Sequence, residues 1–131
     1  MSAALSVDSW KDQARSLNYR NQCFIGNRFV SAASGKTFTC TNPATGKALT
    51  QVSAGDKEDI DRAVKAARAT FEKGVWSRIA GSERKKVLLR FADLMEKHAT
   101  ELALLETLDM GKPIGDSSKV DVPLSIQCIP W

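Results

Sequence analysis

The apolar and polar positions of the chain follow a strand-like pattern first and a helical one later. The apolar pairs at 24–25 and 29–30 flank a Gly-Asn dipeptide, which supplies the positive backbone angles of a tight hairpin. Residues 37–41 and 48–52 form a second pair, rich in Thr and Val, around a loop that contains Pro and Gly. The pattern predicts two successive β-hairpins.

Helical patterns border this β region on both sides. A short amphipathic helix is predicted over residues 8–18, with Asp8 or Ser9 as its N-cap. A longer helix is predicted to begin after Asp56 and to end at Gly74, because glycine favours the left-handed conformation at a helix end. The apolar face of this longer helix consists of Ile60, Ala63, Val64, Ala67 and Phe71.

Two further helices are predicted in the second half of the chain. One begins at Ser82, and the other begins at Thr100 and ends before Gly111 and Pro113. The inward positions of the first are Val87, Leu88, Phe91, Leu94 and Met95. A polar stretch after Pro113 leads into a weaker apolar pattern, where Pro123 is tolerated only near a helix start. The members of that pattern are Val120, Leu124, Ile126 and Ile129.

The chain ends in an apolar run. Residues 128–131 read Cys-Ile-Pro-Trp, whereas a folded domain usually ends in polar, exposed residues. A length of 131 residues suits one domain, and no linker or repeat divides the chain. We therefore expect a single unit, residues 1–131, that lacks a downstream partner for its apolar surface.

Composition narrows the function classes. Hydrophobic residues make up 43% of the chain, no apolar run is long enough to span a bilayer, and no signal peptide opens the chain, so a cytoplasmic protein is expected. The net charge of +4 is spread over alternating basic and acidic residues, which does not favour a nucleic-acid partner. The three cysteines form no CxxC pair, so neither a disulfide framework nor a zinc site is indicated.

Common catalytic motifs do not occur. The glycines never follow the GxGxxG or P-loop spacing, and the single histidine, His98, is interpreted as structural because no serine lies in a GxSxG motif. Packing is the role expected for all three cysteines. The carboxylates of Asp59 and Asp61, and those of Glu101 and Glu106, are interpreted as solvated helix residues rather than acid–base pairs.

Several ordered motifs match one family of enzymes. They are Phe24-Ile25-Gly26-Asn27-Arg28-Phe29-Val30, Thr41-Asn42-Pro43-Ala44-Thr45-Gly46, residues 59–68, Trp76-Ser77, residues 91–96 and Glu106-Thr107-Leu108-Asp109-Met110-Gly111-Lys112-Pro113. In this order they resemble the aldehyde dehydrogenase superfamily over about residues 23–121. The resemblance is greatest to bacterial enzymes that oxidise γ-glutamyl-γ-aminobutyraldehyde and related amino aldehydes.

The resemblance implies a fold and an activity. It implies an α/β fold, of which residues 1–131 form the incomplete N-terminal part of the Rossmann-like cofactor-binding domain, with β-hairpins followed mostly by helices. The intact enzyme is an oxidoreductase and a homo-oligomer that converts an aldehyde to its carboxylate with NAD or NADP. The family's nucleophilic cysteine, general-base glutamate and cofactor motif lie beyond the matched region. The chain alone is therefore expected to be inactive, to bind no cofactor tightly and to be open to self-association.

The resemblance also implies a site for potassium or sodium. Its ligands in the family map onto Cys40, Thr41 and Asp109. A carboxylate and a backbone carbonyl are suitable hard oxygen donors, whereas a thiol is a poor ligand for these ions, so Cys40 would contribute its carbonyl oxygen. The alternative for Asp109 is a simple surface ion pair with Lys112.

A second reading is a non-catalytic interaction module. In this reading the hairpins and helices fold alone and present the basic face between Arg84 and Arg90 to a partner. The other interpretation of this face is a solvated helix flank. Nucleic-acid binding through the same face is disfavoured because acidic residues are interspersed.

Overall fold

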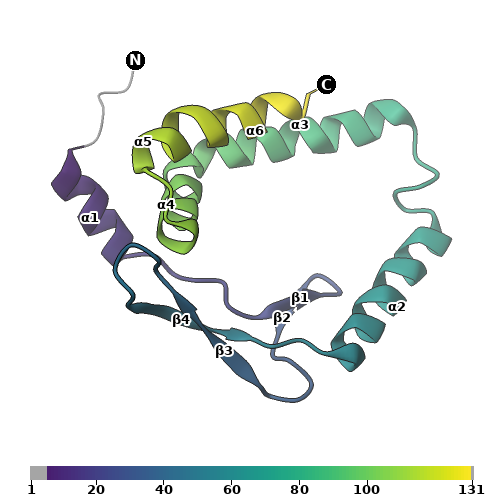
Figure 1. Ribbon diagram of the computed structural model, residues 1–131. Helices are drawn as coiled ribbons and strands as arrows, with labels where there is room; N and C mark the ends of the chain where they lie inside the picture. Colours follow the sequence, from purple (N-terminus) through teal and green to yellow (C-terminus); the bar gives the residue numbers. More distant parts are fainter. Residues whose placement is uncertain (1–5, 131) are drawn as a thin grey trace.

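The computed structural model describes residues 6–130, and it consists of two β-hairpins embedded in a series of helices (Figure 1). Each hairpin is a separate two-stranded antiparallel sheet. The mixed fold predicted from the sequence is therefore confirmed. The elements are α1 (Val7–Arg15), β1 (Cys23–Ile25), β2 (Arg28–Val30), β3 (Thr37–Thr41), β4 (Ala48–Ser53), α2 (Lys57–Lys73), α3 (Gly81–Lys97), α4 (Ala99–Met110), α5 (Ile114–Asp116), the π-helix η1 (Ser117–Asp121) and α6 (Val122–Cys128).

The first hairpin forms for the reason that its turn sequence indicates. Gly26 and Asn27 both adopt positive φ angles, 60° and 65°, and this pair of angles matches the twist of the flanking strands. Phe24 lies opposite Phe29, and their ring centroids are 5.0 Å apart. The turn and this aromatic pair together fix the register of the hairpin.

Helix α1 begins earlier than the pattern predicts. Its N-cap is Ser6, whose hydroxyl oxygen accepts a hydrogen bond of 3.2 Å from the backbone nitrogen of Ser9, and the helix ends at Arg15. The predicted cap, Asp8 or Ser9, is therefore wrong. Both residues lie inside the first turn, where Asp8 is still favourably placed against the positive end of the helix dipole.

Helix α2 has both of its predicted ends. Asp56 is the N-cap and forms a capping box with Asp59, and Gly74 adopts a left-handed conformation with φ of 74°. Asp59, however, is not a solvated carboxylate, because it is only 3% exposed. Its two oxygens accept hydrogen bonds of 3.0 and 3.1 Å from the backbone nitrogen of Ala33, and Arg62 lies 3.3 Å away. Asp59 therefore joins α2 to the loop that follows β2.

Helices α3 and α4 follow each other with a single break at His98. This residue has φ of −105° and ψ of 17°, and it ends one helix and precedes the next. Its ring nitrogen Nδ1 lies 3.3 Å from a carboxylate oxygen of Glu101. The position of His98 at a helix end is the one that the sequence predicts. Helix α3 begins at Gly81 rather than Ser82, and no side chain caps it.

The segment after Pro113 differs from its prediction. The polar stretch expected there is helical, and α5, η1 and α6 follow one another without a break. Pro123 lies in the first turn of α6, directly after the π turn. A proline has no backbone N–H to donate to a helical hydrogen bond, and its ring crowds the carbonyl four residues earlier. The wider π turn accommodates both effects. Helix α6 thus begins directly beyond the π turn, and Pro123 lies near a helix start as predicted.

The interior of the molecule is small. The accessible surface is 9779 Å² for a chain of 14.3 kDa, whereas a compact monomer of that mass exposes roughly 6,800 Å². Within residues 6–130 the buried apolar side chains are Ala32, Ala92, Ala103, Leu104 and Val122. The faces predicted to point inward are largely exposed, with Ile60 at 61% and Phe91 at 52%.

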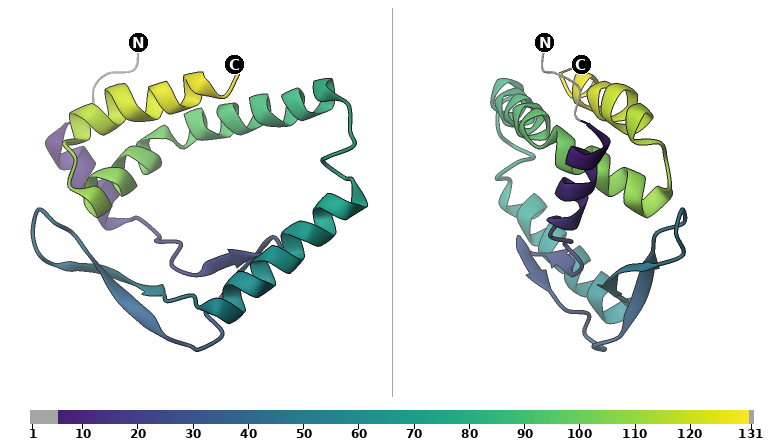
Figure 2. Two further views of the ribbon diagram at one scale, coloured as in Figure 1. Left: turned by 45° about the vertical axis from the view of Figure 1, so that its right-hand side comes forward. Right: turned by 90° about the vertical axis from the view of Figure 1, so that its left-hand side faces the viewer.

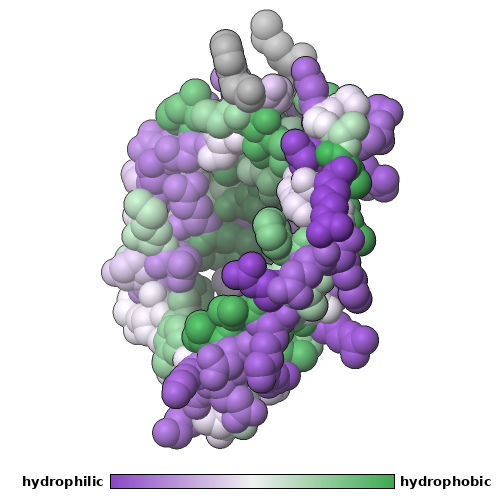
Figure 3. Space-filling view, turned by 90° about the vertical axis from the view of Figure 1, so that its right-hand side faces the viewer, coloured by the Kyte–Doolittle hydropathy of each residue, from purple (hydrophilic) through white to green (hydrophobic). Residues whose placement is uncertain are grey.

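The arrangement of the elements explains this exposure. Helices α3, α4 and α6 form one side, while α2 and the hairpins form the other, as Figure 1 and the left view of Figure 2 show. Figure 3 shows that the space between the two sides is a hollow with apolar side chains in its depth. No helix within residues 6–130 is long and apolar enough to cross a membrane.

The Asp59 contacts predict a specific loss of stability. Replacing Asp59 with Ala leaves the backbone nitrogen of Ala33 unpaired, which should lower the free energy of unfolding by about 2–4 kcal/mol. Asp61→Ala, on the exposed side of the same helix, should change it by less than about 0.5 kcal/mol. Urea unfolding followed by circular dichroism measures both variants. Equal stabilities for the two would contradict the role given to Asp59.

Candidate functional site

The structure brings together two of the three residues assigned to a cation site by resemblance. Cys40 lies in β3 and Asp109 lies in the last turn of α4, 69 positions later in the chain. The Cys40 thiol donates a hydrogen bond of 2.8 Å to Oδ1 of Asp109. Thr41 follows Cys40 directly, so its backbone belongs to the same part of β3.

An irregularity in the second hairpin lies at this point. Cys40 pairs with Thr50, but Thr41 pairs with Ala48, so Leu49 has no partner across the ladder. Such a bulge disrupts the regular strand pairing and turns backbone groups away from it. The unpaired residue Leu49 thus lies across the ladder from Cys40 and Thr41.

A close contact at the end of α4 holds Asp109 against the hairpin. Gly111 ends the helix with φ of 83°, and a Cβ on it would lie 2.8 Å from Cγ of Pro43. Only glycine permits both this angle and this approach. The contact positions the carboxyl end of α4 beside the β3–β4 loop.

The electrostatic environment of the pair is negative. The hydrogen bond to Asp109 raises the pKa of the Cys40 thiol, and burial and the charge of Asp109 act in the same direction. Asp109 also lies at the negative end of the α4 dipole, where a cation is favoured and a carboxylate is not. Burial and then Cys40 raise the pKa of Tyr19 nearby. The Asp109 carboxylate therefore favours the protonated form of the Cys40 thiol.

Further side chains surround the pair that sequence reasoning did not assign to it. Tyr19, Arg20 and Glu106 line the same groove, which has a volume of about 360 Å³. Tyr19 and Arg20 come from the segment between α1 and β1, which has no periodic pattern and gave no signal. Glu106 lies one turn before Asp109 on α4, a spacing that places both carboxylates on one helix face.

The alternative prediction for Asp109, an ion pair with Lys112, is wrong. Lys112 forms its ion pair with Asp121 of the π-helix rather than with Asp109. The contact with Asp121 is the main cause of a raised pKa for Lys112. Gly111 turns the chain away from α4, so Lys112 faces η1 and Asp109 faces the hairpin.

The other two cysteines do not belong to this site. Cys23 is half-buried, as a packing role requires, but Cys128 is exposed, so that prediction is wrong for Cys128 in this structure. Within residues 6–130 no group of three or more His, Cys, Asp or Glu residues is arranged to hold a metal ion. An ion at Cys40 and Asp109 would depend on backbone oxygens for its remaining contacts.

The basic face of α3 is partly engaged in local contacts. Arg84 donates a hydrogen bond of 2.9 Å to the backbone oxygen of Ile79, and Lys86 forms an ion pair of 2.8 Å with Glu83. These contacts fit the interpretation of the face as a helix flank.

Comparison with known proteins identifies relatives along most of the chain. Residues 29–131 match the aldehyde dehydrogenase family. An NADP/NAD-dependent aldehyde dehydrogenase of Escherichia coli is 48% identical over 122 residues, which are 93% of this chain and 25% of the relative. An aminoacetaldehyde dehydrogenase of Pseudomonas aeruginosa is 44% identical over 131 residues, all of this chain and 26% of the relative.

Solved structures agree with these relatives. An indole-3-acetaldehyde dehydrogenase of P. syringae, in complex with NAD+, has a TM-score of 0.95 and 45% identity, and covers 98% of this chain and 26% of its own. A γ-glutamyl-γ-aminobutyraldehyde dehydrogenase of Burkholderia cenocepacia has a TM-score of 0.94 and 44% identity. The match covers 97% of this chain and 26% of that chain. The chain thus spans about a quarter of the length of the relatives it matches. On the family match, the identity and the shared fold, the chain belongs to the aldehyde dehydrogenase family.

Proposed function

We propose that residues 1–131 are the N-terminal part of the cofactor-binding domain of an NAD(P)-dependent aldehyde dehydrogenase. The intact enzyme would oxidise an aldehyde to its carboxylate. The observation that carries the proposal is the near-complete superposition of this chain on a quarter of an aldehyde dehydrogenase solved with NAD+, at 45% identity. Neither the strands of a doubly wound parallel sheet nor a glycine-rich nucleotide motif lies within residues 6–130.

We propose an amino aldehyde as the substrate class. Relatives that act on aminoacetaldehyde and on γ-glutamyl-γ-aminobutyraldehyde support this choice. The indole-3-acetaldehyde enzyme matches the chain equally well. We further propose, from the family resemblance alone, that the intact enzyme is cytoplasmic and a homo-oligomer.

We propose further that Cys40, Thr41 and Asp109 form a potassium or sodium site. The Asp109 carboxylate and the backbone oxygens of Cys40 and Thr41 are the hard donors that such an ion prefers. The negative end of α4 and the bulge in β4 support this assignment. The protonated Cys40 thiol would give up its hydrogen bond to Asp109 when the ion enters.

Grafting the chain tests the enzymatic proposal. Residues 1–131 would replace the matching quarter of the Escherichia coli relative. Because the fold is shared, the graft should oxidise the parent's aldehyde substrate within about tenfold of the parent rate, a difference of roughly 1.4 kcal/mol. NAD(P)H absorbance measures the rate. Residues 1–131 alone should form no NAD(P)H. An inactive graft of normal fold, or turnover by the chain alone, would contradict the proposal.

Thermal unfolding of the graft tests the cation site independently of activity. Potassium chloride at tenfold the dissociation constant should stabilise the graft by about 1.4 kcal/mol relative to choline chloride, which is a few degrees in Tm. Asp109→Asn should abolish this shift, and Cys40→Thr should increase it because a hydroxyl is a harder donor than a thiol. Asp116→Asn, an exposed carboxylate on α5, is the control and should leave the shift intact. A shift that survives in Asp109→Asn rejects the site.

Alkylation tests the geometry of the pair in the chain itself. The Asp109 carboxylate holds the pKa of the Cys40 thiol above its ordinary value, so little thiolate is present near neutral pH. Asp109→Asn should lower that pKa and speed the reaction of Cys40 with iodoacetamide at about pH 8. Mass spectrometry of the Cys40 and Cys23 peptides measures both sites, with Cys23 as the internal reference. An unchanged ratio would mean that the two side chains are not in contact.

A further inference from the structure

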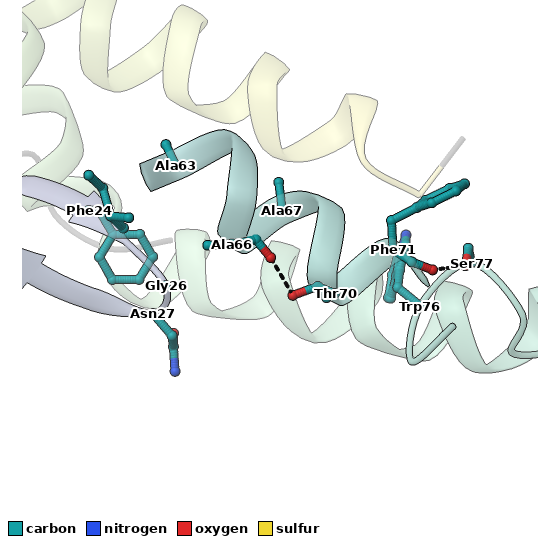
Figure 4. Close-up of a pocket in the computed structure, with 11 residues that line it drawn as sticks. Phe24, Gly26, Asn27, Ala63, Ala66, Ala67, Thr70, Phe71, Trp76 and Ser77 are labelled. Carbon is teal, nitrogen blue, oxygen red and sulfur yellow. Dashed lines mark hydrogen bonds between the residues drawn. The ribbon is translucent and has the colours of Figure 1, made fainter. Parts of the chain in front are cut away.

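The groove between the first hairpin and α2 offers packing surface and little chemistry (Figure 4). None of its lining residues is charged. The hydroxyl of Thr70 donates to the backbone oxygen of Ala66, and that of Ser77 donates to the backbone oxygen of Phe71, each at 3.0 Å. Polar side chains that join separate elements gather instead at the carboxyl end of α4, around Asp109.

The last turn of α4 has a different neighbour on each face. Residues two positions apart on an α-helix differ by a rotation of about 200°, so Thr107 and Asp109 point to nearly opposite sides. Asp109 contacts Cys40 of β3, whereas Thr107 contacts Ser117 of η1. The turn that carries Asp109 is thus held between the second hairpin and the π-helix.

Two polar contacts join this turn to the π-helix. The hydroxyl of Thr107 donates a hydrogen bond of 3.1 Å to Oγ of Ser117, which is fully buried. The ammonium group of Lys112 forms an ion pair with the carboxylate of Asp121. Thr107 precedes Asp109 and Lys112 follows it, so the two contacts, here called the η1 contacts, bracket the carboxylate on both sides in the sequence.

The ion pair is more sheltered from solvent than the other ion pairs. The side chains of Lys112 and Asp121 are 28% and 29% exposed, whereas each other ion pair within residues 6–130 has a partner that is at least 42% exposed. Solvent screens a sheltered pair less, and removal of one partner leaves the other charge uncompensated. Because only two residues separate Lys112 from Asp109, the pair also restrains the backbone of Asp109.

We propose that the η1 contacts position Asp109 as the ligand of the cation, by holding its carboxylate against β3. The inference rests on the proposed cation site. Thr107 and Lys112 are positioning residues, because neither lines the groove that contains Cys40 and Asp109. Their effect on the ion passes through the backbone of α4 and its C-terminal turn.

Potassium-dependent stabilisation of the graft tests the proposal. Lys112→Met removes the ion pair, so the potassium concentration that gives half of the maximal Tm shift should rise by about tenfold. Lys119→Met removes an exposed lysine of η1 and is the matched control, which should leave this concentration unchanged. A merely structural role would lower Tm without potassium and leave the half-maximal concentration as in the parent. That result would overturn the proposal.

A double-mutant cycle assigns the effect to the pair. Asp121→Asn should weaken potassium binding as Lys112→Met does, and the two changes together should weaken it no further, because they remove the same contact. Lys112→Arg retains the pair and should retain the parent affinity. Additive effects of the two changes, or an arginine variant as weak as Lys112→Met, would reject the pair as the positioning element.

The hydrogen bond provides a second, milder variant. Thr107→Val removes one hydroxyl and keeps the shape of the side chain, so it should fold even if Lys112→Met does not. It should raise the half-maximal potassium concentration by about fivefold. An unchanged concentration in Thr107→Val would contradict the role given to this contact.

Alkylation separates failure of the η1 contacts from failure of the cation site. In residues 1–131 without added potassium or sodium, Lys112→Met should speed the reaction of Cys40 with iodoacetamide relative to Cys23, because Asp109 moves away from the thiol. Unchanged Cys40 reactivity in Lys112→Met would reject the positioning role, whatever the result with potassium. A parent graft without a potassium shift would reject the cation site itself.

Discussion

Burial of apolar surface is the constraint on which the rest of this structure depends. The apolar faces of α2 and α3 have few partners within residues 6–130, so tertiary packing contributes little to holding the individual elements. Local interactions take a larger share of that role. The Asp56 and Asp59 capping box, the left-handed glycines at helix ends and the Gly26–Asn27 turn all act over a few residues of sequence.

This dependence on local interactions explains which elements the sequence predicts well. The first hairpin and α2 carry their own start and stop signals, and both lie where those signals indicate. Errors occur where a local rule competes with a distant contact. Asp59 has the pattern of a surface carboxylate, but the backbone nitrogen of Ala33, 26 positions away, draws it into the interior. The positions of the apolar faces were predicted correctly, but their burial was not. The pattern does not reveal whether a partner surface is present.

The candidate site, too, was only partly predictable from the sequence. The residues of the chain do not by themselves bring Cys40 and Asp109 together, since neither belongs to a spaced ligand motif. Family resemblance supplied the assignment, and the approach of Gly111 to Pro43 supplies its physical basis. Tyr19 and Arg20 were missed because they reach the same groove from an irregular segment with no pattern to read.

The π turn at η1 has a consequence for the register of the C-terminal helix. A π turn accommodates one residue more than the regular helical period allows, and each residue of an α-helix corresponds to a rotation of about 100°. Apolar positions on the two sides of the turn therefore do not belong to one continuous stripe, which is why their pattern is weak. Ser117 is fully buried in this turn and accepts a hydrogen bond from Thr107, while Val122 is buried just beyond it. Deletion of a single residue here would restore an ordinary helix and rotate all of α6 about its axis, turning Val122 toward solvent.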